Sequence, residues 1–345
     1  MDASIAGILA LDGVTNGAVY ALLAIATVLL FSVTRVLFIP QGEYVAYGAL
    51  TLGMFQLGQT PGTVWLLLAL TAFACLTESV ALFRRGQDFF AVLRHVRSVA
   101  GWPVIISMLS VWAAPKLPPL WVQALLTLGL VTPLGGMVWR IAFRPLADAS
   151  VLVLLIVSVG VHFVLTGLGL VFFGAEGYRN PSFWDERFSL GALSLSGQTV
   201  IMLLASVALI AMLWLFFERS LYGKALNATA VNRLGARIVG ISTETAGRSA
   251  FLLAAFIGAL SGLLVGPTTT IFYDSGFLIG LKGFVAAVFA GLHSYPLAAL
   301  GAVLLGMVES FGAFQASAFK EVIVFTSILP VLLWRSLRHP DHEEH

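Results

Sequence analysis

Long, uninterrupted apolar runs constrain this chain more than any other feature. The runs at 151–173, 200–217 and 297–308 contain no Asp, Glu, Lys or Arg. A helix needs about 20 predominantly apolar residues to cross the hydrocarbon core of a membrane. The strands of membrane barrels instead alternate apolar and polar residues over about 10 positions, whereas these runs are apolar all round. They therefore predict an all-α polytopic membrane protein.

Charged residues are correspondingly scarce. Of 345 residues, 10% are charged and 59% are hydrophobic, whereas a soluble domain carries about 25% charged residues. The net charge of +2 is too small to indicate a nucleic-acid partner. The single cysteine, Cys75, lies in an apolar run and is expected to be a small buried side chain. The first four residues lack the basic region of a signal peptide, so the first apolar run is expected to be a retained span.

The apolar pattern predicts about eleven transmembrane helices. They are 5–33, 36–57, 62–83, 100–114, 120–140, 150–173, 199–217, 249–266, 276–292, 295–313 and 319–334. The second holds Glu43 and several glycines, so we expect it either to cross fully or to be partly re-entrant. Residues 1–335 are expected to form a single transmembrane domain, and 336–345 a polar tail.

The basic residues predict the orientation of these helices. With the N-terminus outside, fourteen Lys and Arg residues fall in inner segments and four in outer segments. The inner ones are Arg35, Arg84, Arg85, Arg94, Arg97, Arg140, Arg144, Arg219, Lys224, Arg233, Arg237, Arg248, Arg335 and Arg338; the outer ones are Lys116, Arg179, Arg187 and Lys320. Because cytoplasmic loops carry the basic excess, we expect the N-terminus outside and the C-terminus in the cytoplasm. Segment 174–198 then becomes an external loop and 218–248 a cytoplasmic one.

The cytoplasmic loop 218–248 has the pattern of an amphipathic helix from Lys224 to Val239. Val231, Leu234 and Ile238 fall on one side of this helix, and Arg233 and Arg237 fall on the other. Gly240 stands where such a helix would stop. The apolar side is expected to dock on a partner protein, to pack on the membrane surface, or to have no role.

The same loop resembles the coupling loop of the branched-chain amino acid ABC importer permeases. That family shows the pattern G-[RK]-A-x-x-A-x-x-x-[DN]-x-x-x-A-x-x-x-G-I. Here the pattern is filled by Gly223, Lys224, Ala225, Ala228, Asn232, Ala236, Gly240 and Ile241. The stretches 16–26, 41–49, 144–150, 251–267, 283–294 and 299–310 also resemble the family, in the family's order. The resemblance covers roughly 1–60 and 140–335.

The resemblance implies a permease subunit that moves branched-chain amino acids or a similar small polar solute across the bacterial inner membrane. It also implies the partners: two cytoplasmic ATP-binding subunits, a second related permease or a second copy, and an external solute-binding protein. ATP and magnesium would be used by the partner subunits, so this chain would bind no cofactor. Two features depart from the family: Gln41 replaces its usual histidine, and 84–118 reads as an insertion. The family also carries urea, amides and other carboxylates, so the solute stays open.

Ionisable residues within spans are costly and therefore mark functional candidates. Lys282 and Glu309 are expected either to form an internal ion pair or to line the translocation pathway. Gln41, Gly42 and Glu43 match the family's second span and are expected either to hydrogen-bond a broken helix or to contact the solute.

Other residues in the spans are expected to serve packing. Glu78 and His162 are expected to have their hydrogen bonds satisfied within the protein. Gly258, Gly262 and Gly266 recur every four residues on one helix face. Small residues at that spacing allow another helix to approach closely.

The sequence offers no catalytic motif, metal motif or nucleotide-binding P-loop. Two other classes of protein remain as alternatives. An ATP-independent secondary transporter or channel would need no docking loop. An intramembrane enzyme would need a clustered acid–base or metal site.

Overall fold

The computed structural model describes residues 3–190, 193–330 and 333 of the chain. Most of these residues are helical. The α-helices are α1 (Ala3–Thr34), α2 (Gln41–Gln56), α3 (Gly62–Arg84), α4 (Phe89–Ala113), α5 (Leu120–Val138), α6 (Val151–Phe173), α7 (Gly197–Arg219), α8 (Leu221–Val231), α9 (Arg233–Ile238), α10 (Thr243–Val265), α11 (Ser275–Phe289), α12 (Tyr295–Gln315) and α13 (Lys320–Thr326). Short 3₁₀ turns occur at Ala114–Lys116, Arg144–Leu146 and Ser317–Phe319, and a π-helical turn at Trp139–Phe143.

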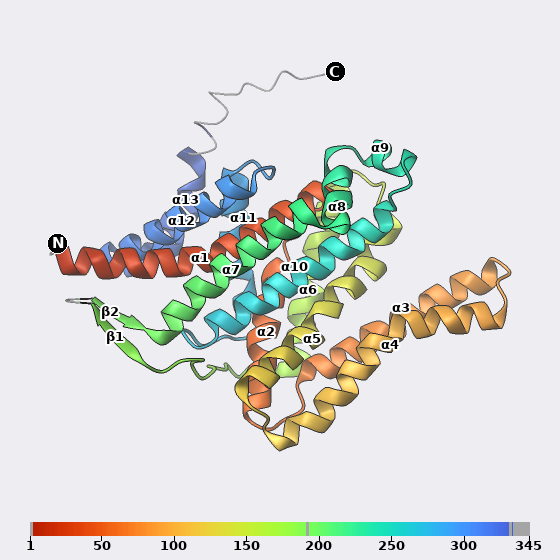
Figure 1. The fold of residues 1–345 in the computed structure, drawn as a ribbon, viewed down its shortest axis with the longest axis horizontal. Helices are drawn as coiled ribbons and strands as arrows, with labels where there is room; N and C mark the ends of the chain where they lie inside the picture. The colour runs from red at the N-terminus through yellow and green to blue at the C-terminus, as the bar shows by residue number, and fades with distance from the viewer. Residues whose placement is uncertain (1–2, 191–192, 331–332, 334–345) are drawn as a thin grey trace.

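The long helices form one bundle (Figure 1). Helices α8 and α9 lie at one end of it, and the two-stranded hairpin of β1 (Arg187–Leu190) and β2 (Leu193–Ser196) lies at the other. Helices α3 and α4 run side by side as a hairpin that projects from the bundle. Helix α10 packs against α1, α2 and α5, so it lies at the centre of the bundle.

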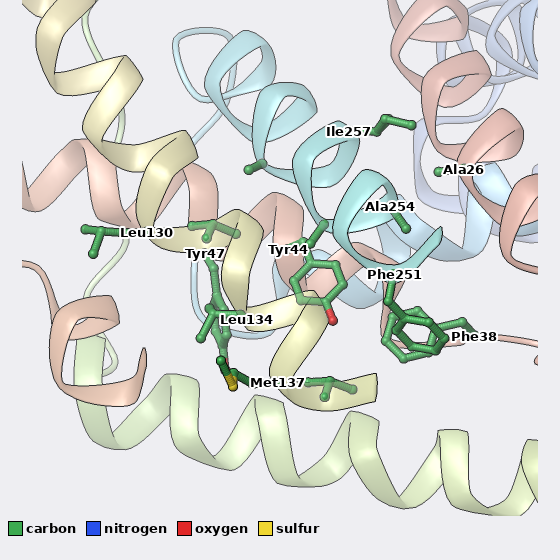
Figure 2. Packing of buried hydrophobic residues seen from close by; sticks show 14 of the residues in the cluster. Ala26, Phe38, Tyr44, Tyr47, Leu130, Leu134, Met137, Phe251, Ala254 and Ile257 are labelled. Atoms are coloured by element: carbon green, nitrogen blue, oxygen red, sulfur yellow. The ribbon is translucent and has the colours of Figure 1, made fainter. Parts of the chain in front are cut away.

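The core is built around α2 and α10. Figure 2 shows Phe38, Tyr44 and Phe251 packed together between these helices and α5. The ring centroids of Phe38 and Phe251 are 4.9 Å apart, and those of Phe38 and Tyr44 are 5.8 Å apart. Fourteen of the sixteen residues of α2 are buried. Protein therefore surrounds α2, and lipid does not reach it.

Eight of the predicted spans coincide with helices long and apolar enough to cross a membrane. The chain is thus an all-α polytopic protein, as predicted. The other three predicted spans contain α2, α11 and α13, which have 16, 15 and 7 residues. Even α2 extends only about 24 Å at 1.5 Å per residue, less than the roughly 30 Å hydrocarbon core. The total of eleven spans therefore stays a prediction.

Two predicted helix boundaries in the N-terminal half are wrong. The second helix begins at Gln41 and not at 36, because Pro40 disfavours helical geometry at the residue before it. The fourth begins at Phe89, so Arg94 and Arg97 lie in the same helix as the predicted span 100–114. Gly86, at φ +74°, ends α3 just before this helix.

The predicted external loop 174–198 contains the antiparallel β1–β2 hairpin. One further helix boundary is wrong in the C-terminal half. Helix α10 begins at Thr243, six residues before the predicted 249. The hydroxyl oxygen of Ser242 accepts a hydrogen bond from the Thr245 N–H at 3.2 Å and so caps the helix. The predicted tail, 336–345, lies outside the described residues.

The predicted small-residue face of α10 does pack closely. A Cβ atom at Gly262 would overlap the backbone carbonyl of Val45, and one at Gly258 would lie 2.7 Å from the Cβ atom of Tyr44. Helices α2 and α10 therefore approach backbone to backbone along this face.

Candidate functional site

The predicted loop helix 224–239 is two helices, and the prediction of one continuous helix is wrong. Asn232 takes an extended conformation (φ −151°, ψ 101°) between α8 and α9. Its Oδ1 atom accepts a hydrogen bond from the Gly235 N–H at 2.9 Å, so Asn232 is the N-cap of α9. Ser220 caps α8 in the same way, through the Gly223 N–H at 2.9 Å. Gly240 follows α9 at φ +86°, where the sequence predicts the stop.

The predicted apolar side chains of this segment are exposed. Val231 is 88% exposed, Leu234 70% and Ile238 77%. Leu226 and Ala236 face inward and are buried. The α8–α9 segment thus has a buried face against the bundle and a second apolar face that no described residue covers.

The two arginines of the segment tie it to the stretch 144–150. The Arg233 guanidinium donates to the carbonyl oxygen of Ala147 at 3.2 Å. Arg237 forms an ion pair with Asp148 at 3.1 Å and donates to the Thr243 hydroxyl at 3.0 Å. Partial burial, with Arg237 nearby, lowers the pKa of the Arg233 side chain. Two motifs that the sequence singled out separately are therefore in contact.

The remaining motif residues divide between packing and exposure. Gly223 is buried where α7 turns into α8, and a Cβ atom there would overlap the Phe216 carbonyl. Lys224, Ala228, Arg237 and Gly240 are exposed, whereas Ala225, Arg233 and Ile241 are half-buried. The motif therefore specifies the shape of the segment at some positions and its surface at others.

A second group of candidates lies within the bundle, far from α8–α9 along α10. The Nζ atom of Lys282 on α11 lies 2.5 Å from the Glu309 Oε1 atom on α12 and 3.2 Å from the Glu321 Oε1 atom on α13. The Tyr20 hydroxyl on α1 donates to Glu309 Oε2 at 2.7 Å. Only 6% of the Lys282 side chain and 10% of the Glu309 side chain are exposed. The ion pair between Lys282 and Glu309 is therefore one of the two arrangements that the sequence predicts.

A cavity of about 490 Å³ adjoins this ion-pair cluster. It is lined by Asn16, Val19, Tyr20, Val265, Thr268, Thr269, Thr270, Ile271, Ser275, Leu278, Ile279, Lys282, Glu309, Lys320 and Glu321. Its walls combine charged groups, hydroxyls and aliphatic side chains. Such a mixture suits a small amphipathic molecule.

The three candidates on α2 lie elsewhere, in the core. The Glu43 carboxylate is fully buried and lies 3.0 Å from the Nδ1 atom of His162 on α6. Gln41 donates to the carbonyl oxygen of Ala254 at 2.9 Å. A Cβ atom at Gly42 would overlap the backbone carbonyl of Gly276. None of these three residues lines the cavity beside Lys282.

Sequence reasoning missed several partners of these groups. Glu321 and Tyr20 were not candidates, although Tyr20 belongs to the matched stretch 16–26. The hydrogen bonds of Glu78 are expected to be satisfied within the protein, and they are satisfied through ion pairs with basic side chains. It pairs with Arg140 at 2.9 Å, with Arg144 at 2.7 Å and with His95 at 2.7 Å. Residue type alone does not reveal such partners, because they come from helices distant in sequence.

Comparison with known proteins gives a consistent match. A family model described as "Branched-chain amino acid transport system / permease component" matches residues 9–333. The chain is similar to the high-affinity branched-chain amino acid transport system permease protein BraD of Pseudomonas aeruginosa, with 29% identity over 67% of this chain and 78% of that protein. It is also similar to LivH of Escherichia coli, with 29% identity over 58% of this chain and 67% of that protein. A solved structure, PsaBC from Streptococcus pneumoniae in complex with Fab, matches with a TM-score of 0.37 and 12% identity over 94% of this chain and 90% of that chain.

Proposed function

The chain belongs to the family of permease components of branched-chain amino acid transport systems, and on that premise we propose how it works. It is the membrane-spanning subunit of an ATP-driven importer. Its solute is a branched-chain amino acid or a similar small polar molecule, as the names of its relatives indicate. The chain is half of the translocation pathway and has no ATPase site of its own.

The observation that carries this proposal is the exposed apolar face of α8–α9. Val231, Leu234 and Ile238 project from this segment, and Leu221, Tyr222 and Val239 are exposed as well. Burying a large aliphatic side chain is worth about 1.5–3 kcal/mol. A cytoplasmic ATP-binding subunit docked on this face would bury all three side chains. The contacts of Arg233 and Arg237 with 147–148 would pass movement of that subunit to the bundle.

The partners follow from this role. Two cytoplasmic ATP-binding subunits use ATP and magnesium, a second permease subunit or second copy completes the pathway, and an external solute-binding protein delivers the solute. The assembly lies in the bacterial inner membrane, with the N-terminus outside and the C-terminus in the cytoplasm. The distribution of basic residues supports this orientation, because fourteen of them fall on the inner side and four on the outer.

Replacing Leu234 by Asp tests the docking role. The change puts a charge where an apolar contact is expected, so the affinity for the ATP-binding subunits should fall about ten- to a hundredfold, at 1.4 kcal/mol per tenfold. Co-purification of the ATPase and solute-stimulated ATP hydrolysis should both be lost. The amount of permease in the membrane should not change, because Leu234 has few contacts within the chain.

Two controls make the result specific. Leu234→Met keeps the apolar character and should keep the complex. Gln87→Asp adds the same charge at an exposed polar position between α3 and α4, and it should also keep the complex. A Leu234→Asp permease that co-purifies with a full complement of ATPase and normal stimulated hydrolysis would remove α8–α9 from the mechanism.

A second experiment separates this function from an ATP-independent transporter. Leucine uptake into cells should stop when the partner ATPase carries an inactivating substitution, while the proton gradient is intact. An ATP-driven importer has no other energy source, whereas a secondary transporter would continue. Concentrative uptake that persists without ATP hydrolysis would favour the secondary transporter.

A further inference from the structure

In the ion-pair cluster beside the cavity, the hydrogen-bond donors and acceptors of the described residues are not all paired. Glu309 has both oxygens occupied, one by Lys282 and one by Tyr20. Glu321 has its Oε1 atom within 3.2 Å of Lys282, but its Oε2 atom is buried and has no donor among the described residues. The Lys320 ammonium lies 3.8 Å from Oε1 of Glu321 and is half-exposed. One buried carboxylate oxygen thus has no hydrogen-bond donor among the residues that the structure describes.

The ammonium of Lys282 has more hydrogen-bond donors than the described residues use. It carries three N–H donors, and two of them are directed to Glu309 and Glu321. In the described part of the chain, no acceptor is recorded for the third. The cluster therefore presents an open acceptor on Glu321 next to an open donor on Lys282. Leaving such groups unpaired away from water is costly, and a ligand with the opposite pair of groups would relieve that cost.

The rest of the cavity fits an aliphatic group. Val19, Val265, Ile271, Leu278 and Ile279 line it beside the charged groups. Its volume of about 490 Å³ lies within the range of sites for small molecules. A ligand with a charged head and a short aliphatic side chain therefore matches both halves of the wall.

We propose that this cavity holds a zwitterionic amino acid in transit, with its ammonium at Glu321 Oε2 and its carboxylate at Lys282 Nζ. Glu309, fixed by the Tyr20 hydroxyl, positions Lys282 and does not itself contact the solute. The passage of an amino acid rests on the function proposed above, whereas the cavity's preference for an ammonium group does not.

Charge-selective thiol modification tests this assignment directly. In a Cys75→Ala background, which removes the single native thiol, Thr269→Cys places a thiol on the cavity wall. The purified complex is treated with a cationic reagent, 2-aminoethyl methanethiosulfonate, or with an anionic one, 2-sulfonatoethyl methanethiosulfonate. Rates are normalised to Gln59→Cys, an exposed position between α2 and α3. We expect Glu321→Gln to lower the ratio of the cationic to the anionic rate at least fivefold, because it removes the acceptor for the ammonium group while Lys282 remains. Glu321→Asp should keep the ratio of the parent.

Protection by solute supplies the second measurement. Leucine should slow modification of Thr269→Cys, and 4-methylpentanoate, which lacks only the amino group, should not. This comparison leaves Glu321 intact, so it is decisive even if Glu321→Gln fails to accumulate. A ratio of the two rates that Glu321→Gln leaves unchanged, or equal protection by the two solutes, would overturn the assignment.

Leucine uptake by the Cys75→Ala parent separates the two hypotheses. Uptake without an effect of Glu321→Gln on the ratio of the two rates and without selective leucine protection contradicts the zwitterion site alone. A ratio that depends on Glu321 together with selective leucine protection, but without uptake in the assembled complex, contradicts the importer function alone.

Discussion

Gly42 is the point at which two helices touch without side chains between them. A Cβ atom at this position would overlap the Gly276 carbonyl and lie 2.9 Å from the backbone nitrogen of Gly280. Gly276 and Gly280 are four residues apart on α11, so they present one smooth face to α2. The contact fixes the depth of α2 in the bundle, and with it the placement of the Glu43 carboxylate beside His162.

Substituting Gly42 by Ala should therefore destabilise the protein by about 1–3 kcal/mol, the usual cost of overpacking a core. Gly101→Ala is the matched control, since Gly101 also lies within a helix but nothing lies within 4 Å of its Cβ position. That change should be neutral or stabilising by up to about 1 kcal/mol. Thermal unfolding of the two purified variants in detergent makes the comparison. Equal melting temperatures would contradict the close α2–α11 contact.

Sequence reasoning identified the costly residues, with the Lys282–Glu309 pair as one of two alternatives, but not their other partners. Lys282 and Glu309 were candidates because a charge within a span demands an explanation. Glu321, which completes the cluster, lies beside Lys320 near the start of a predicted span, where charges are common. Gln41, Gly42 and Glu43 resemble the family's second span, yet their contacts here are with α6, α10 and α11. Their place in the pathway stays a prediction.

At the level of the element, the break between α8 and α9 is the clearest departure from the sequence pattern. Val231, Leu234 and Ile238 keep helical spacing across Asn232, so periodicity alone predicts one helix. Asn is a strong N-cap residue, however, because its side chain can replace a missing backbone acceptor. The spacing predicts the exposed apolar face correctly, while the cap decides the direction of the chain.

Replacing Asn232 by Ala should merge α8 and α9, because alanine favours the helix and cannot cap. The cost of the lost cap is about 1 kcal/mol, too small to prevent assembly. Solute-stimulated ATP hydrolysis should fall, because the exposed face then points elsewhere. Asn232→Asp, which can still accept from the Gly235 N–H, should keep activity. Equal hydrolysis by the two variants would mean that the break has no role in coupling.

The architecture of the whole molecule leads to a prediction about its sides. Residues 174–190 and helices α8 and α9 lie near opposite ends of the bundle (Figure 1). With the N-terminus outside, a cysteine replacing Asp185 should react with an impermeant maleimide on intact cells. A cysteine replacing Asn227 on α8 should react only after permeabilisation. Both positions are exposed, so accessibility within the fold is matched. Labelling in the reverse order would invert the orientation.

How far the sequence predicts the fold depends on helix length. Helices such as α6 and α7 carry 23 mostly apolar residues, and hydropathy finds them almost to the residue. Helix α2 is buried by its neighbours and α11 is about half buried, so neither need be long enough to span the membrane alone. Hydropathy records how apolar a segment is, but not whether lipid or protein surrounds it. It therefore cannot separate these short helices from full spans.

The hairpin of α3 and α4 leaves and rejoins the bundle at one place. The Gln56 amide donates to Gln123 Oε1 at 2.6 Å, which ties the residues before α3 to those after α4. Because the excursion adds an even number of crossings, its gain or loss would leave every later segment on its original side of the membrane. Removing the pair would therefore leave the basic residues of all other loops on their predicted sides. The hairpin is thus a place where the chain could be shortened without inverting the spans that follow it.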